Sequence, residues 1–248
     1  MINRLSDVLP LYTVTEYPKS GGTWIGQMLS DALGVPFPRN KRPAIKPSLL
    51  HTHLLAMPRD EKTIAVFRDG RDVMVSLYFH MLFENDTSSP FVVHETRRAL
   101  RFSDYNDVKN NLPRFIEYVF DKDKRSLSPY HFTWAEFVDS WYSSEATKVR
   151  YEDFVYEPAA ELIETLRKLG GKQPATKTID SIVNKYSFEN QTKRKAGQED
   201  RQSFLRKGQP GDWREKFNSD ACKVFSELAG EQLITLGYEI SDKWVNEL

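Results

Sequence analysis

The stretch Tyr17–Trp24 (YPKSGGTW) constrains the fold more than any other part of the chain. Residues 11–16 (LYTVTE), directly before it, are typical of a β-strand. Directly after it, apolar residues recur at helical spacing, namely Ile25, Met28, Leu29 and Ala32. A strand, a tight loop and a helix start in this order form a place where backbone N–H groups and the helix dipole attract an anion. Gly21 and Gly22 let the backbone approach a phosphate closely.

The side chains of this loop suit a nucleotide. Lys19 supplies a mobile positive charge, and the hydroxyls of Ser20 and Thr23 supply donors. Trp24 supplies a flat aromatic face for a base. A Gly-Gly turn without any ligand is the structural alternative, because many α/β proteins have one between a strand and a helix. The loop is not a Walker A loop, because Lys19 precedes the glycines instead of following them.

The composition is that of an ordinary globular protein, with 248 residues of which 40% are hydrophobic. Lys plus Arg equals Asp plus Glu at 35 each, so nucleic acid is not expected as a partner. Cys222 is the only cysteine, which excludes an intramolecular disulfide and a cysteine-cluster metal site. The first residues lack the apolar core of a signal peptide, and no apolar run approaches the about 18 residues of a membrane span. We therefore expect a soluble, cytoplasmic protein without a membrane partner.

Strand and helix patterns alternate along the chain. Further strands are expected at residues 62–67 (KTIAVF) and 148–154 (KVRYEDF). Further helices are expected after Asp72 as a cap, from Trp134 to Trp141, over residues 158–169, from Ile179 to Tyr186, and after Ser219 as a cap. This alternation predicts an α/β fold with a central, mostly parallel sheet flanked by helices. Ligands bind at the carboxyl ends of such strands, where Lys19, Arg68 and Tyr151 fall.

Two stretches show little apolar periodicity. Residues 84–131 are interpreted as a long loop with short helices, serving as a lid or an acceptor-side insertion. Residues 189–212 are charged and contain glycine, and taken alone they are typical of a disordered linker.

Four separated segments together resemble one family, the sulfotransferases that use 3′-phosphoadenosine 5′-phosphosulfate (PAPS), and most closely its soluble cytosolic branch. The segments are YPKSGGTW (17–24), FRDGRDVMVSLYFH (67–80), RYEDF (150–154) and RKGQPGDW (206–213). They stand in the family's order and span most of the chain. The resemblance implies one sulfotransferase domain over residues 1–248. It also implies a P-loop-like sheet and a C-terminal loop that clamps the nucleotide.

The resemblance also implies the donor site. The 5′-phosphate would be held by Lys19, Ser20, Gly21, Gly22 and Thr23. The adenine pocket would be lined by Trp24, Tyr151 and Phe188. The 3′-phosphate would be bound by Arg68, Ser76, Arg206, Lys207 and Gly208.

His53 stands in a Thr-His-Leu sequence, where the family has its catalytic base. A neutral imidazole suits proton removal from a hydroxyl and contributes about 10²–10⁴-fold. A structural histidine is the alternative, because a lone histidine beside an apolar strand usually has that role. His51 lies on the same face of an extended segment, at a position where the family usually has Lys, so it either assists at the sulfuryl group or is neutral there. Lys19 suits stabilisation of the leaving phosphate, where negative charge builds up.

The sequence indicates no metal site, and the implied mechanism needs none. Glu152 and Asp153 form an acidic pair at a strand end, but further ligands are lacking. The residues Asp69, Arg71 and Asp72 are interpreted as local caps and ion pairs.

We therefore expect an enzyme that moves a sulfuryl group from PAPS, by in-line displacement, to a hydroxyl or an amine of a small-molecule acceptor, with adenosine 3′,5′-bisphosphate (PAP) as the product. The acceptor is not named by the sequence. The family's usual dimer segment is absent from residues 217–223, so the oligomeric state stays open. The alternatives are a P-loop-type small-molecule kinase, which would need Mg²⁺, and a catalytically inactive nucleotide-binding module.

Overall fold

The structure is a computed structural model that describes residues 11–39, 47–57, 61–121, 131–171 and 173–246. The chain divides into two compact units. One unit, here the sheet unit, comprises Met1–Arg68 and Asp139–Lys195. The other, here the helical unit, comprises Asp69–Val138 and Ala196–Leu248. Among the described residues, no helix combines the length and the apolar character needed to cross a membrane.

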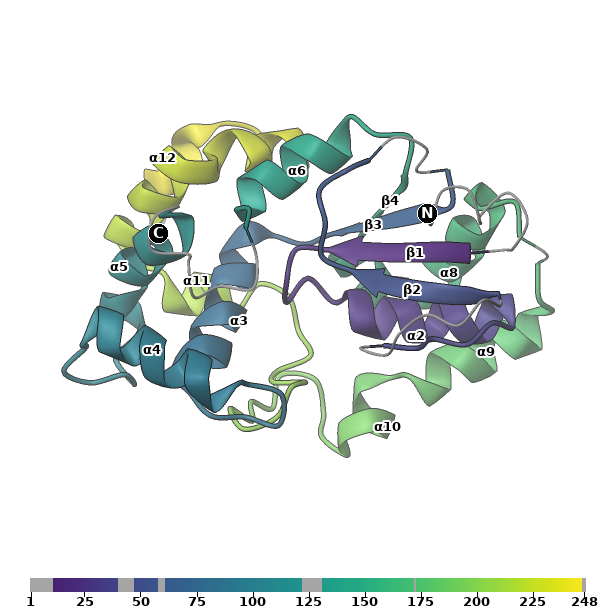
Figure 1. Ribbon diagram of the computed structural model, residues 1–248, viewed down its shortest axis with the longest axis horizontal. Coiled ribbons are helices and arrows are strands. Elements are labelled where there is room, and N and C mark those ends of the chain that lie inside the picture. The colour runs from purple at the N-terminus through teal and green to yellow at the C-terminus, as the bar shows by residue number, and fades with distance from the viewer. Residues whose placement is uncertain (1–10, 40–46, 58–60, 122–130, 172, 247–248) are drawn as a thin grey trace. The chain divides into compact units, whose positions relative to one another are not determined.

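The sheet unit is built on four parallel strands in the order β2-β1-β3-β4 (Figure 1). The strands are β1 (Leu11–Glu16), β2 (Ser48–Thr52), β3 (Thr63–Phe67) and β4 (Thr147–Arg150). Every residue of β3 is buried, as expected for a strand covered on both faces of a parallel sheet. The predicted α/β fold with a parallel sheet and flanking helices is confirmed.

Helices of the sheet unit cover the strands and build its core. They are α2 (Gly22–Leu33), α7 (Tyr151–Tyr156), α8 (Pro158–Lys168), α9 (Thr176–Lys185) and α10 (Phe188–Thr192). As the helical spacing predicted, Ile25, Met28 and Leu29 of α2 are fully buried and pack in one cluster with Val14 of β1. The strand, loop and helix expected around residues 17–24 are therefore present.

The helical unit is held together by large aromatic side chains. Its helices are α3 (Gly70–Leu82), α4 (Pro90–Leu100), α5 (Val108–Phe120), α11 (Trp213–Lys216), α12 (Ser219–Thr235) and the 3₁₀ helix η2 (Asp242–Asn246), and α6 (Trp134–Tyr142) begins in this unit. Trp134 and Phe225 are buried with ring centroids 5.7 Å apart. A Cβ atom on Gly70 would lie within 2.8 Å of both rings, so the start of α3 packs directly on this pair.

The expectation of a long loop with short helices over residues 84–131 is right about the presence of helices but wrong about their extent in the part that the structure describes. It contains two regular helices, α4 and α5, of 11 and 13 residues. In α5 the buried residues Leu112, Phe115, Ile116 and Val119 follow helical spacing. Pro113 lies inside that pattern and acts as a helix-breaking signal in the sequence, although burial of the apolar face outweighs it.

Three predicted boundaries are corrected. The strand expected over residues 148–154 ends at Arg150, and α7 begins at Tyr151. The cap of α3 is Asp69, whose side chain accepts a hydrogen bond from the Arg71 N–H, instead of Asp72. The cap of α12 is Asn218 instead of Ser219. At both caps a neighbouring polar residue of similar capping propensity takes the position, so local preference did not decide it.

The part of the charged stretch 189–212 that lies in the helical unit is ordered by hydrogen bonds within that unit. The Gly197 N–H donates to the Lys207 carbonyl at 2.8 Å, and the Asp200 N–H donates to the Arg206 carbonyl at 2.9 Å. Asp72, which does not cap α3, accepts hydrogen bonds from the backbone N–H groups of Gly211 and Trp213 at 2.6 and 2.9 Å. A buried carboxylate on α3 therefore anchors the end of the stretch.

Candidate active site

The loop between β1 and α2 has the strained backbone that a close turn requires. Lys19 and Gly21 have positive φ angles of 72° and 94°. A Cβ atom on Gly21 would lie 2.4 Å from the Tyr151 ring, so only glycine fits there. The Ser20 N–H donates to the Tyr17 carbonyl at 3.1 Å, which closes the turn.

Polar groups with anion-binding chemistry gather at this loop. The Ser20 hydroxyl is buried, and among the described residues it has no hydrogen-bond partner. The Arg68 guanidinium, from the end of β3, donates to the Lys19 carbonyl at 2.9 Å and lies 4.5 Å from the centre of the Tyr151 ring. A buried hydroxyl and a guanidinium beside a helix N-terminus are groups that a phosphate would satisfy.

Aromatic side chains stand beside the loop. The Trp24 indole N–H donates to the Tyr186 carbonyl at 2.7 Å, which fixes the ring. Its ring meets Tyr151 edge-on at 5.8 Å between centroids. Phe188 begins α10 and is partly exposed, with the Arg194 guanidinium 5.2 Å from its ring. Trp24 and Tyr151 thus form one aromatic corner next to the Arg68 guanidinium.

Glu16 is a candidate site residue that the sequence analysis missed. Its carboxylate accepts a hydrogen bond from the Gly22 N–H at 2.6 Å and pairs with His51 Nε2 at 2.9 Å. Gly22 makes room for it, because a Cβ atom there would lie 2.8 Å from the Glu16 carboxyl carbon. Burial raises the pKa of Glu16, but the hydrogen bond and charge of His51 and the charge of His53 outweigh burial, so the pKa is lowered.

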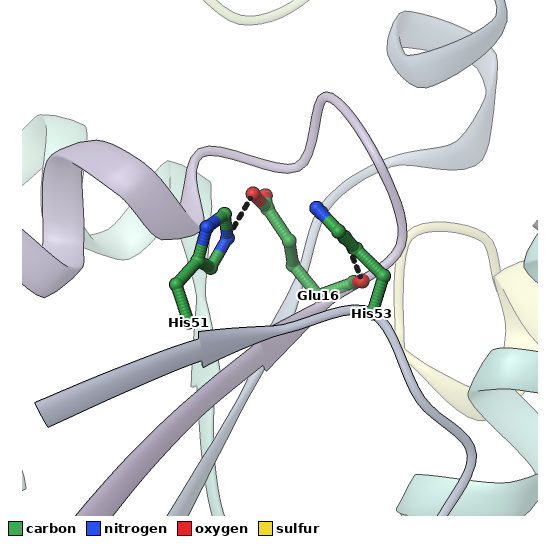
Figure 2. A group of neighbouring side chains, drawn as sticks. All are labelled: Glu16, His51 and His53. Carbon is green, nitrogen blue, oxygen red and sulfur yellow. Dashed lines mark hydrogen bonds and ion pairs between the residues drawn. The ribbon is translucent and has the colours of Figure 1, made fainter. Parts of the chain in front are cut away.

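The tautomer of His53 follows from one contact. Its Nδ1 atom lies 3.0 Å from the Glu16 backbone carbonyl oxygen, which can only accept a hydrogen bond (Figure 2). Nδ1 therefore carries the proton, and the lone pair of the neutral ring is on Nε2. Burial lowers the pKa of His53 against the opposing charge of Glu16, so the ring is neutral at pH 7.

The strand register explains why these three residues meet. β1 and β2 are parallel, with Val14 opposite His51 and Thr15 opposite Thr52, so Glu16 comes level with His53. Alternate residues of a strand face the same side, and the rings of His51 and His53 accordingly lie 4.8 Å apart. Figure 2 shows the Glu16 side chain between the two rings. The prediction that both histidines share one face is confirmed.

The remaining predicted site residues belong to the helical unit. Ser76 is partly buried on α3, and Gly208 has a φ angle of 65°. Asp212 holds both cationic side chains of the predicted clamp, with Arg206 Nη2 at 2.5 Å and Lys207 Nζ at 2.6 Å. Burial raises the pKa of Asp212, but the charges of these two cations outweigh it and lower the pKa.

The fold and the loop define a class of protein, the α/β proteins with a P-loop-like parallel sheet. A family model described as the sulfotransferase domain matches residues 36–237. The chain therefore belongs to the sulfotransferase family, and the predicted family of PAPS-dependent transferases is confirmed. The matched residues include the two histidines, and the loop at 17–24 precedes them.

Known proteins agree with this assignment. Sulfotransferase 1A1 from Bos taurus is 24% identical over 278 residues, which cover 93% of this chain and 85% of that protein. The fold is similar to that of mouse sulfotransferase SULT7A1 complexed with PAP, with a TM-score of 0.64, 19% identity and coverage of 95% of this chain and 87% of that one. It is also similar to retinol dehydratase in a complex with retinol and PAP, with a TM-score of 0.60, 16% identity and coverage of 90% and 81%.

Proposed function

We propose that this sulfotransferase transfers the sulfuryl group of PAPS to a hydroxyl, or an amine, of a small-molecule acceptor, with His53 as the general base and Lys19 at the leaving phosphate. The observation that carries the proposal is the hydrogen bond between His53 Nδ1 and the Glu16 carbonyl. It leaves the lone pair on Nε2, which is the form that accepts a proton. PAPS, when bound, supplies an activated sulfuryl group.

The role of His53 is supported by its environment. A histidine whose pKa is lowered by burial is unprotonated at pH 7, so no proton must be lost before it accepts one from the acceptor hydroxyl. The nearby Glu16 carboxylate also stabilises the imidazolium that forms when the proton is taken up. Both properties favour a base over a purely structural histidine.

The role of Lys19 is supported by its position in the loop. Its left-handed backbone conformation, with a φ of 72°, is unusual for a residue other than glycine and is typical of functional loops. Its carbonyl is held by Arg68, so the start of the loop is fixed before any ligand arrives. An ammonium group there would stabilise negative charge on the departing phosphate oxygen.

In each unit, the residues proposed to bind PAPS have side chains or backbone groups that suit a phosphate or an adenine. In the sheet unit, the buried Ser20 hydroxyl and the backbone of Gly21, Gly22 and Thr23 suit a phosphate, and the aromatic residues Trp24, Tyr151 and Phe188 suit adenine. Arg68 is proposed as a phosphate ligand of this unit. In the helical unit, the proposed ligands of the 3′-phosphate are Ser76, Arg206, Lys207 and Gly208.

The Gly22 N–H is not available to a bound phosphate in this structure. It donates to the Glu16 carboxylate, so a phosphate that takes this donor must displace a charged group. We propose that the Glu16 carboxylate releases the Gly22 N–H when the donor binds and keeps its pair with His51. The proposed setting is the cytoplasm, with no metal required for the transfer itself.

Isothermal calorimetry with PAP tests the donor site. We expect one PAP per chain, and ATP with Mg²⁺ should bind more weakly. Absence of PAP binding, or tighter binding of Mg²⁺–ATP, would contradict the proposal and favour a kinase. In the same titration Lys19→Met should bind PAP more weakly than the unaltered chain. Lys185→Met is its control and should bind PAP normally, because it removes a lysine of the same unit that pairs with Asp31 on the surface. Transfer to a panel of hydroxyl and amine acceptors, followed by mass spectrometry, then identifies the acceptor.

A further inference from the structure

We propose that Glu16, His51 and His53 form a binding site for a divalent transition-metal ion of the zinc type. One carboxylate oxygen and one nitrogen from each ring all lie within 4.8 Å of one another. Zinc bonds of about 2.0–2.2 Å in a tetrahedral arrangement place ligand atoms about 3.3 Å apart. The three side chains therefore have to move closer together when they coordinate an ion.

The ligand types match zinc and not magnesium. Two histidines and one glutamate form a ligand set that zinc sites use, with the fourth position taken by water. Imidazole nitrogen suits zinc and its neighbours in the periodic table, whereas Mg²⁺ prefers an octahedral shell of oxygens. The site therefore discriminates between these ions by chemistry alone.

One contact prepares His53 for this role. A histidine that binds metal usually donates its other ring N–H to a carbonyl or a carboxylate, which orients the ring. His53 already makes this contact through Nδ1 to the Glu16 carbonyl, and Nε2 keeps its lone pair.

The contact between Glu16 and His51 fits the same proposal. Their atoms are 2.9 Å apart, and both side chains are nearly buried. A metal ion would replace this hydrogen bond and compensate the buried negative charge. Gly22 keeps space for the carboxylate, since any larger residue would push it away from the two rings.

Occupancy has a functional consequence that rests on the proposed function. A metal on His53 Nε2 takes the lone pair that would accept the proton of the acceptor. Zinc and base catalysis therefore compete for one atom. We expect micromolar or tighter zinc to inhibit transfer reversibly, and EDTA to restore it.

Zinc binding to the metal-stripped full chain is the deciding experiment, because it needs neither donor nor acceptor. Calorimetry and competition with a chromogenic chelator should give one Zn²⁺ per chain, with no competition from Mg²⁺. His51→Asn, His53→Asn and Glu16→Gln should each raise the Kd by at least about 10–100-fold. Co²⁺ in place of zinc should give a visible absorption spectrum of low coordination number, which the same variants lose.

A matched control is His94→Asn. It also removes a histidine that pairs with a carboxylate, Glu95 Oε1 at 3.0 Å, but on the exposed surface of α4. This variant should bind zinc as the unaltered chain does. If the unaltered chain binds no zinc, or if His94→Asn weakens binding as much as His51→Asn does, the site is refuted. Circular dichroism establishes that each variant is folded, and the two histidine variants suffice if Glu16→Gln unfolds.

Discussion

The Nδ1 atom of His53 lies 3.0 Å from the backbone carbonyl oxygen of Glu16, the last residue of β1. This contact joins the proposed proton acceptor to the start of the proposed donor-binding loop at residues 17–24. The loop leaves β1 directly after Glu16, so the end of this one strand sets the position of the loop and of the His53 ring. A backbone carbonyl does not titrate, and the tautomer of His53 therefore does not change with pH as long as the ring is neutral.

The pH profile of transfer should report His53. Burial lowers its pKa below the ordinary value of 6.5, and only the neutral ring accepts a proton. We therefore expect kcat/KM to rise with pH through an inflection below 6.5 and to be level near pH 7. His53→Ala should lower transfer by about 10²–10⁴-fold while PAP binding stays nearly unchanged. A profile with its inflection above 6.5 would assign the proton to another group.

The free energy of unfolding should fall as the pH is lowered, in two windows. Below the ordinary pKa of 6.5, the unfolded chain protonates His53 while the folded chain resists, so stability declines. Glu16 has a lowered pKa in the folded chain, and its contribution is present above the ordinary value of 4.5 and is lost as the pH falls through the folded pKa. His53→Gln should remove the first decline. It should reduce but not abolish the second, because His51 still lowers the pKa of Glu16 after the charge of His53 is gone. Urea unfolding at a series of pH values measures both declines.

Lys19→Met should lower kcat by about 10²–10³-fold, the effect of removing one group that stabilises charge in a transition state. The shape of methionine keeps the apolar part of the side chain, so the loop should remain folded. Lys185→Met is the control and should leave kcat unchanged, since that lysine pairs with Asp31 on the surface. Equal losses in both variants would point to a general charge effect. Single-turnover measurement separates the chemical step from product release.

The strand, loop and helix around residues 17–24 could be predicted because their signals are local. The strand pattern, the small residues and the helical spacing stand next to one another in the sequence. His51 and His53 were assigned to one face for the same reason, since a spacing of two decides it in an extended segment. Each of these features depends on a few consecutive residues.

Glu16 could not be found this way, because its role depends on the register between two strands. Thirty-five positions separate it from His51, and only the pairing of Val14 with His51 brings the side chains together. The anchor role of Asp72 was missed for a similar reason, because its partners Gly211 and Trp213 are distant in the sequence. Helix α5 was missed because Pro113 hides a regular apolar face.

Gly21→Ala should weaken PAP binding by at least tenfold and destabilise the fold. A Cβ atom would be strained at a φ of 94° and would also collide with the Tyr151 ring at 2.4 Å. Gly170→Ala is a matched control, because Gly170 has a φ of 66° with nothing within 4 Å of its added Cβ atom. That variant should show only the left-handed strain of about 1–2 kcal/mol and normal PAP binding. If both variants bind PAP equally well, the close approach at Tyr151 has no part in the site.

Arg71→Met should destabilise the helical unit by about 3–5 kcal/mol, because it leaves the buried carboxylate of Asp69 and the partly buried one of Glu239 without their cation. The Arg71 side chain is 1% exposed, donates to both Asp69 and Glu239, and stacks 3.6 Å from the centre of the Trp213 ring. The prediction that it is a local structural pair is thereby extended to the C-terminal part of the unit.

Arg98→Met is the control for this change. Arg98 is 67% exposed and pairs with Glu95 along one face of α4, an arrangement that contributes less than about 1 kcal/mol. In urea unfolding, the loss in the free energy of unfolding should therefore be clearly larger for Arg71→Met than for Arg98→Met. High salt should reduce the small loss at Arg98 further and leave the large loss at Arg71 nearly unchanged. Similar losses of stability in the two variants would mean that the buried pairs of Arg71 gain no more from their contacts than a surface pair does.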